Sequence, residues 1–168
     1  APAVLTIAGS DPSGGAGMQA DLKTFAALGT YGMSVLTVIT DCTTEGVADL
    51  QSLSASFVAR QLDRAATDLR PQAVKTGMLF ETGIIEAVTE TVERQGLSPL
   101  VVDPVMTTRR GESLLSSDAV ASMCQLVGRA TLVTPSRPEA EELARMGIRS
   151  RREVEAVLAE GVVHLLED

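Results

Sequence analysis

The sequence predicts an α/β fold in which a doubly wound, mostly parallel sheet carries helices on both faces. Short apolar runs alternate along the chain with segments of helical periodicity. Most of these runs are apolar at every position, which is typical of parallel strands that are covered on both sides. The length of 168 residues and the hydrophobic content of 45% suit a single domain, residues 1–168.

The predicted strands are short runs dominated by Ala, Val, Leu, Ile and Met. In chain order they are residues 3–8, 33–40, 73–76, 100–103, 131–134 and 162–166. The segments between them have the apolar spacing of helices that could cross from one parallel strand to the next. These predicted helices are residues 18–28, 57–69, 83–95, 118–127, 139–146 and 152–160.

The ends of several predicted helices are marked by their chemistry. Thr82 and Ser117 are predicted N-caps, because a hydroxyl at that position accepts a hydrogen bond from a first-turn amide. Glycines occur where a left-handed residue would end a helix, at Gly29, Gly96, Gly128, Gly147 and Gly161.

The loops that follow the strands are the most polar and glycine-rich parts of the chain. Right-handed crossovers bring these loops to one edge of the sheet, and ligands bind at that edge in doubly wound folds. The loops gathered there are predicted to be residues 9–17, 41–42, 77–78, 103–111 and 135–139. We therefore expect a ligand site at the carboxyl ends of the strands.

Charge and cysteine usage narrow the class of partner. The net charge of −8 disfavours nucleic acid or an anionic membrane as the main partner. Cys42 and Cys124 form neither a C-x-x-C pair nor a cluster with the single histidine, so no disulfide framework or zinc site is indicated. The chain has no apolar run of ~18 residues and begins without a basic leader, which predicts a cytoplasmic protein without a membrane span.

The first loop contains Gly14, Gly15 and Gly17, and Asp21 follows in the next helix. Residues 15–20 also match the dinucleotide pattern G-x-G-x-x-A, with Asp41 as a candidate ribose acid. In that pattern the first glycine stands at the strand end, whereas residues 10–14 intervene here, so a dinucleotide-binding oxidoreductase is the weaker hypothesis. A Walker loop is excluded, because no Lys-Ser or Lys-Thr closes the glycines.

The whole run AGSDPSGGAGMQADLKTF, residues 8–25, resembles the opening of the hydroxymethylpyrimidine and phosphomethylpyrimidine kinases of thiamine biosynthesis. The resemblance continues in AALGTYGMS (26–34), VKTGML (74–79), VDPVM (102–106), TP (134–135) and PEAE (138–141). It implies a ribokinase-like fold, ATP and Mg²⁺ as cofactors, a small heterocyclic substrate, and a homodimer.

The resemblance also implies a substrate pocket. Gly9 and Asp21 would lie against the pyrimidine, with the Asp21 carboxylate accepting hydrogen bonds from an amino or hydroxymethyl group. Met78 and Val105 would form the apolar walls of the pocket. Cys42 stands where the family has a glutamine that pairs with the pyrimidine edge, so the resemblance predicts altered discrimination among flat heterocycles.

A second group of implied residues belongs to the phosphates and the metal. Asp103 would face Mg²⁺ and the phosphates, and Glu139 would help to hold the metal, often through water. Arg109 takes the place of a family lysine and would neutralise phosphate. Ser136 replaces a family asparagine near the metal and the phosphates.

The family's late Gly-Thr-Gly turn, which cradles the transferred phosphate and supplies the base, has no counterpart here. Beyond Met106 the glycines stand at 111, 128, 147 and 161, too far apart to build it. No catalytic residue is therefore assigned, and we expect this sequence to lack the C-terminal ATP-binding and catalytic portion. The leading hypothesis is ATP-dependent phosphorylation of 4-amino-5-hydroxymethyl-2-methylpyrimidine, of its monophosphate, or of both, in thiamine biosynthesis. A pyridoxal-type kinase and a non-catalytic heterocycle-binding relative are the alternatives.

Overall fold

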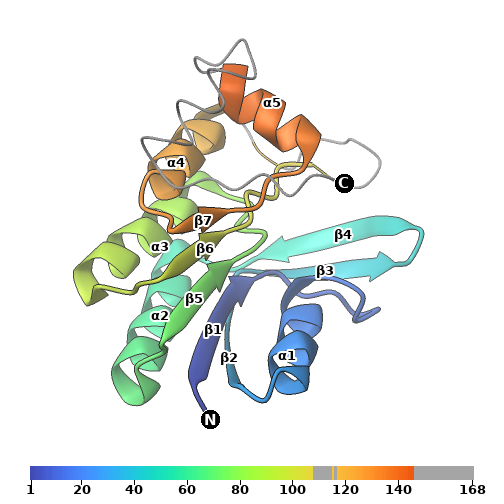
Figure 1. Ribbon diagram of the computed structural model, residues 1–168. Helices are drawn as coiled ribbons and strands as arrows, with labels where there is room; N and C mark the ends of the chain where they lie inside the picture. The colour runs from blue at the N-terminus through green and yellow to red at the C-terminus, as the bar shows by residue number, and fades with distance from the viewer. Residues whose placement is uncertain (108–114, 116, 146–168) are drawn as a thin grey trace.

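The computed structural model describes residues 1–107, 115 and 117–145, which form a five-stranded parallel sheet, a two-stranded ribbon and five helices (Figure 1). The parallel strands are β1 (Ala3–Ala8), β2 (Tyr31–Leu36), β5 (Ala73–Thr76), β6 (Leu100–Val102) and β7 (Leu132–Val133). The ribbon consists of β3 (Val38–Thr43) and β4 (Gly46–Ser52). The helices are α1 (Gly17–Ala27), α2 (Ala55–Leu69), α3 (Thr82–Gln95), α4 (Ser117–Val127) and α5 (Arg137–Arg145).

The order of strands in the main sheet is β2-β1-β5-β6-β7, and every neighbouring pair is parallel. From β1 the chain moves outward to β2, and it then returns past β1 to build β5, β6 and β7 on the other side. The direction of winding therefore reverses between β1 and β5. The loops after these two strands meet at that reversal, which is where ligands bind in doubly wound sheets.

The two faces of the sheet carry different helices, which confirms the doubly wound prediction. Leu5 and Ile7 of β1 belong to the hydrophobic core, together with apolar residues of α2, α3 and α4. Thr6, between them, points to the opposite face, where its hydroxyl donates to Asp21 of α1. In Figure 1, α1 lies on one side of the sheet, whereas α2, α3 and α4 follow one another on the other.

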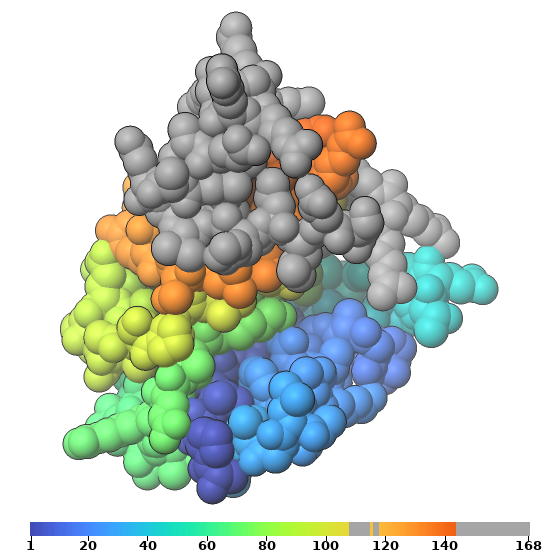
Figure 2. Space-filling view, in the orientation of Figure 1, coloured from blue at the N-terminus to red at the C-terminus, as the bar shows by residue number. Residues whose placement is uncertain are grey.

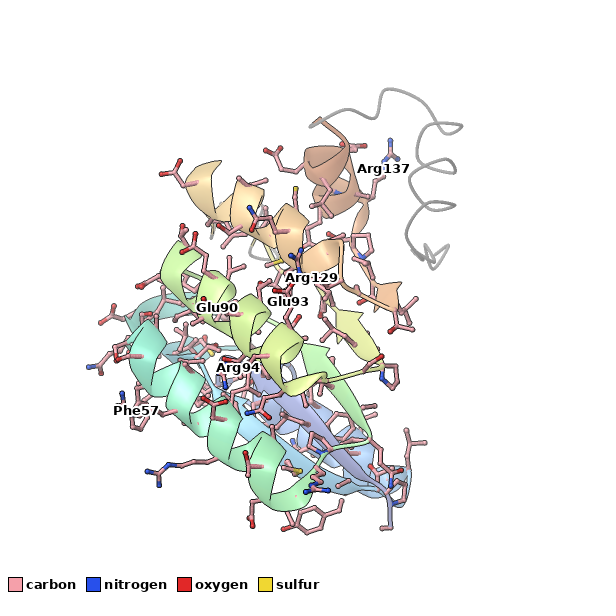
Figure 3. The ribbon with its side chains drawn as sticks, turned by 90° about the vertical axis from the view of Figure 1, so that its left-hand side faces the viewer. Phe57, Glu90, Glu93, Arg94, Arg129 and Arg137 are labelled. Atoms are coloured by element: carbon pink, nitrogen blue, oxygen red, sulfur yellow. The ribbon has the colours of Figure 1, made fainter. Side chains whose placement is uncertain are left out.

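The core lies on the face that carries three helices. Leu62 of α2, Ile84 of α3 and Met123 of α4 are fully buried there, whereas α1 contains no buried residue. Ion pairs join the outer surfaces of these helices: Arg94 of α3 pairs with Asp63 of α2, and Arg129 pairs with Glu93 of α3 (Figure 3). The sheet is therefore anchored mainly from the α2–α4 side.

The single strand expected at residues 33–40 is wrong, because the chain changes direction at Thr37. The Thr37 hydroxyl donates to the Met78 carbonyl at 2.7 Å, and its backbone bonds to Ala8 and Leu53. Beyond Thr37, β3 leaves the sheet and pairs antiparallel with β4. This ribbon projects from the body of the molecule (Figures 1 and 2). Most residues of β4 are exposed, so no buried pattern marked it in the sequence.

The remaining boundaries differ by small amounts from the predicted ones. Thr82 is not an N-cap, because α3 begins at Thr82 and Glu81 caps it through the backbone alone. Ser117 is likewise the first residue of α4. Gly29 and Gly96 are left-handed, as predicted, with φ of 71° and 63°, whereas Gly128 is not.

Several predictions concern residues outside the described part of the chain. They are the helix at 152–160, the strand at 162–166, and the glycines Gly147 and Gly161. Among the described residues, no helix has the length and apolar character that a membrane span requires.

Candidate functional site

The glycine-rich loop after β1 is held in shape by the carboxylate of Asp11. Its oxygens accept hydrogen bonds from the Ser13 hydroxyl at 2.7 Å, the Ser13 amide at 2.9 Å and the Ala16 amide at 2.7 Å. These bonds, with the Ser13 hydroxyl contributing most, lower the pKa of Asp11 from 3.8 to about 2. Asp11 is therefore ionised at neutral pH and organises the loop.

Two glycines allow this loop to pass close to its neighbours. Gly17 has a φ of +57°, and a Cβ there would lie 2.6 Å from the Gly9 carbonyl oxygen. The Gly9 carbonyl oxygen accepts a hydrogen bond from the Met18 amide at 2.9 Å. This bond holds the start of α1 directly beside the end of β1. A Cβ on Gly9 would lie 2.6 Å from Cε of Met78. The structure thus brings together Gly9 and Met78, two residues that the resemblance assigned to the same pocket.

A charged cluster lies on the α1 side of the sheet, beside the reversal between β1 and β5. Nζ of Lys75 is 3.1 Å from both carboxylate oxygens of Asp21 and 3.6 Å from Oδ2 of Asp103. The Thr6 hydroxyl donates to Oδ2 of Asp21 at 2.6 Å. One cation therefore lies between two carboxylates that sequence reasoning assigned to different halves of the site.

Asp103 has the more open of these two carboxylates. Its side chain is 33% exposed, compared with 18% for Asp21. Burial raises the pKa of Asp103 above its usual value, and the Lys75 ammonium opposes that rise. The negative charges of Glu139 and Asp21 act in the same direction as burial. Burial is thus the main cause of the raised pKa of Asp103, and Lys75 is the cation that lies beside it.

Glu139, in the first turn of α5, is only 6% exposed, and protein donors engage both of its oxygens. Oε1 accepts from the Met106 amide at 3.1 Å, and Oε2 accepts from the amide and hydroxyl of Ser136 at 2.8 and 2.7 Å. Its carboxylate therefore ties α5 to the loop after β6. Ser136 directs both of its donors to Glu139.

Cys42 of β3 lies beside the glycine-rich loop. Its sulfur is 3.3 Å from Oδ1 of Asp11 and 3.3 Å from Oγ1 of Thr40. Thr40 in turn holds Ser10, through its amide to the Ser10 hydroxyl at 2.9 Å and through its hydroxyl to the Ser10 carbonyl at 2.8 Å. The ribbon is thus bonded directly to the loop after β1. Both Cys42 and Cys124 have free thiols.

Three candidate residues remain: Val105, Arg109 and Asp41. Val105 is half-buried in the loop after β6, where its amide donates to the Asp103 carbonyl at 2.9 Å. Arg109 lies outside the described residues. Asp41 is exposed in the antiparallel ribbon, so it does not end a parallel strand as a dinucleotide-binding acid would, and that alternative is wrong.

Sequence reasoning missed Lys75 as a site residue. The signal for it was a charged side chain within the short strand 73–76, between Val74 and Thr76, where an unpaired ammonium would be costly. Its partners are 54 and 28 positions away in the chain, so the spacing of residues could not identify them.

The arrangement offers hydrogen-bond acceptors and one open carboxylate, next to an apolar wall at Met78. Such a site can orient a small polar heterocycle. In the described part of the chain, no group of three or more His, Cys, Asp or Glu side chains could enclose a metal ion. Mg²⁺ usually keeps water and phosphate oxygens among its ligands and needs no such group, and the partly exposed carboxylate of Asp103 is chemically compatible with it.

Several known proteins resemble the chain closely. A family model described as phosphomethylpyrimidine kinase matches residues 11–164. The hydroxymethylpyrimidine/phosphomethylpyrimidine kinase of Escherichia coli (strain K12) is 49% identical over 140 residues, which are 83% of this chain and 53% of that protein. The Bacillus subtilis (strain 168) protein of the same name is 42% identical over 167 residues, covering 96% of this chain and 62% of that protein. The chain thus spans less than two thirds of the length of either relative.

Solved structures agree with these sequence relatives. Phosphomethylpyrimidine kinase from Clostridium difficile 630 superposes with a TM-score of 0.89 at 41% identity, over 98% of this chain and 74% of that one. The pyridoxal kinase of Staphylococcus aureus in complex with pyridoxal gives a TM-score of 0.82 at 36% identity, over 99% of this chain and 64% of that one.

Proposed function

The chain belongs to the phosphomethylpyrimidine kinase family, and on that premise we propose that it serves the ATP-dependent phosphorylation of 4-amino-5-hydroxymethyl-2-methylpyrimidine, of its monophosphate, or of both. The observation that carries this proposal is the cluster of Asp21, Lys75 and Asp103 beside the reversal of the sheet. It combines a hydrogen-bond acceptor for a polar heterocycle with a carboxylate suited to the phosphate side.

In this proposal the substrate lies against the loops after β1 and β5. Asp21 accepts a hydrogen bond from the amino or hydroxymethyl group, and an ionised acceptor makes that bond stronger than a neutral one would. Gly9 leaves room for the Met78 side chain, and Met78 and Val105 form the apolar walls. Thr37, by holding the Met78 carbonyl, fixes the position of that wall.

The phosphate side would involve Asp103, Glu139, Ser136 and Arg109. Asp103 would hold Mg²⁺ together with water and phosphate oxygens, and the metal would supply neutralisation of phosphate charge. Glu139 would act on the metal through water, because its oxygens already hold Met106 and Ser136. Arg109 would bind the phosphates of ATP, and Ser136 would do so by turning its hydroxyl from Glu139 to a phosphate oxygen.

The chain itself, in this proposal, supplies the substrate half of a ribokinase-like domain. The family's Gly-Thr-Gly turn, which would assist the transfer of the phosphoryl group, has no counterpart in residues 1–168. A cytoplasmic location and a homodimer belong to the same proposal. Sedimentation equilibrium tests the dimer: a single species of twice the 17.6 kDa chain mass is expected, and a monomer at all concentrations contradicts it.

The function is tested on the full-length protein by calorimetric titration with the pyrimidine alcohol, followed by coupled measurement of ATP turnover. Binding together with pyrimidine-dependent turnover supports the kinase. Binding of the pyrimidine without affinity for ATP identifies the chain as a heterocycle-binding relative instead. Absence of any binding overturns the proposal.

Pyridoxal is the second candidate substrate, because two observations favour it. Cys42 replaces the amide that would pair with a pyrimidine edge, and the pyridoxal kinase of Staphylococcus aureus is among the structural relatives. Titrating the chain with both heterocycles separates the two hypotheses. A lower Kd for pyridoxal than for the pyrimidine alcohol would favour the second.

A further inference from the structure

Lys75 is a charged residue whose partners on the two neighbouring strands carry no charge. It lies in the middle strand of the sheet, in register with Thr6 of β1 and Val101 of β6, and its side chain is 23% exposed. Its ammonium reaches Asp21 on one side and Asp103 on the other. A half-buried lysine paired with two carboxylates links the loops that carry them.

The space for this ammonium is provided by Gly77. A Cβ on Gly77 would lie 3.1 Å from Nζ of Lys75 and 3.1 Å from Cβ of Ala8. Gly77 does not have a positive φ, so its backbone conformation is open to other residues. The absence of a side chain at Gly77 therefore matters for the room it leaves beside Lys75.

We propose that Lys75, lying in the space left by Gly77, is a positioning residue that aligns the Asp21 carboxylate for substrate recognition and keeps it beside Asp103. This inference rests on the proposed function. It adds that Lys75 and Asp21 together determine which substrate the site prefers. Without the ammonium, two half-buried carboxylates would face each other unscreened, and Asp21 would turn away from Asp103.

The hydrogen bonds of Asp21 indicate which oxygen serves the substrate. Among the described residues, Oδ2 accepts from both the Thr6 hydroxyl and Lys75, whereas Oδ1 accepts from Lys75 alone. A carboxylate oxygen has two lone pairs, so Oδ1 retains capacity for one more donor. The amino or hydroxymethyl group of the substrate is the donor that fits this vacancy on Oδ1.

The experiment measures how well variants distinguish the substrate from analogues that lack one polar group. Calorimetric titration gives Kd for the pyrimidine alcohol, for an analogue without the amino group and for an analogue without the hydroxyl. The variants are Lys75→Met, Lys75→Arg and Gly77→Ala. Their controls are Arg94→Met, which breaks an exposed ion pair on α3 (Figure 3), and Gly83→Ala, whose Cβ would have its nearest contact at 3.6 Å.

Wild-type protein is expected to prefer the pyrimidine alcohol to one of the analogues by about tenfold, the value of one good hydrogen bond. Lys75→Met should abolish that preference and Lys75→Arg should restore part of it. Gly77→Ala should reduce the preference about threefold, because Nζ must move by a few tenths of an ångström. Both controls should keep the wild-type preference.

An unchanged preference in Lys75→Met would overturn the inference while leaving the proposed function intact. If the affinity for all three ligands falls by the same factor, so that the preference is kept, Lys75 is structural only. If the wild-type chain binds none of the ligands, the proposed function fails and the inference fails with it.

Discussion

Side chains of the same type and the same burial can change the stability of this protein in opposite directions, depending on their hydrogen-bond partners. Thr37 and Thr76 are both fully buried. The Thr37 hydroxyl donates to the Met78 carbonyl, whereas the Thr76 hydroxyl has no partner among the described residues. Their identical side chains therefore contribute to stability with opposite signs.

Replacing each threonine by the isosteric valine tests this difference. Thr37→Val leaves the Met78 carbonyl without its donor and should lower the free energy of unfolding by about 1–2 kcal/mol. Thr76→Val removes an unpaired buried hydroxyl and should raise it by about 1 kcal/mol. Urea denaturation measures both values. A loss of stability in Thr76→Val would show that its hydroxyl has a partner.

Glycines with the same backbone conformation also differ in how much a substitution should cost. Gly17 and Gly96 share a left-handed backbone, but a Cβ on Gly17 would meet the Gly9 carbonyl at 2.6 Å, whereas a Cβ on Gly96 would meet nothing within 4 Å. Gly96→Ala should therefore cost only the left-handed strain of about 1 kcal/mol. Gly17→Ala should cost about 3 kcal/mol, because backbone must also move. Equal changes in thermal stability would contradict this prediction.

Elements were predicted well where burial leaves a pattern along the chain and poorly where it does not. The strands predicted at 3–8 and 73–76 match β1 and β5 at both ends, and each contributes apolar side chains to the core, Leu5 and Ile7 from β1 and Val74 from β5. Most positions of β3 and β4 are exposed, and of this ribbon only residues 38–40 fell within a predicted strand. The turn at Thr37 depends on partners in three other segments, which the local sequence does not reveal.

The position of α5 depends on one buried carboxylate. Glu139 accepts two hydrogen bonds from Ser136 and one from the Met106 amide. Glu139→Gln replaces an acceptor oxygen by an amide that must face a donor, and should lower stability by about 1–3 kcal/mol. The rate of amide hydrogen exchange should rise in α5 and in the loop after β6, and nowhere else. Ser136→Ala serves as the milder control, since it removes only one of the three bonds.

At the scale of the whole molecule, the reversal of the sheet between β1 and β5 decides which side chains meet. It brings α1, with Asp21, next to β5, with Lys75, although 54 positions separate the two residues. The same arrangement puts Met78 against Gly9. The ribbon is joined to this region through Thr37 and Thr40.

The stability of the whole fold should depend on pH, because folding lowers the pKa of some carboxyl groups and raises the pKa of another. The pKa of Asp11 falls from 3.8 to about 2 in the folded chain, and that of Asp63 is also lowered, chiefly by its hydrogen bond to Arg94. Such groups stabilise the fold above pH ~4, and that contribution is lost as the pH falls through the folded pKa. The raised pKa of Asp103 acts in the opposite sense, because its protonation favours the folded chain.

We therefore expect the free energy of unfolding to fall between pH 4 and pH 2, and to fall less steeply in Asp11→Asn. Asp11 is partly exposed and its charge is screened by water, so its share should stay below about 1 kcal/mol. Urea denaturation at a series of pH values measures it, with Ser13→Ala as a weaker variant of the same change. Parallel profiles for wild type and Asp11→Asn over this range would contradict the prediction.

The sequence alone determined the fold class, most of the strands and helices, and the family, because apolar periodicity and uninterrupted motifs are local properties of the chain. It also identified Gly9, Asp21, Met78 and Asp103 as residues of one region. Only the tertiary structure showed that Lys75 lies between Asp21 and Asp103, that Gly77 makes room for it, and that Glu139 is engaged by Ser136 and Met106. These contacts depend on the order of strands in the sheet, and strand order brings together residues that no local pattern connects.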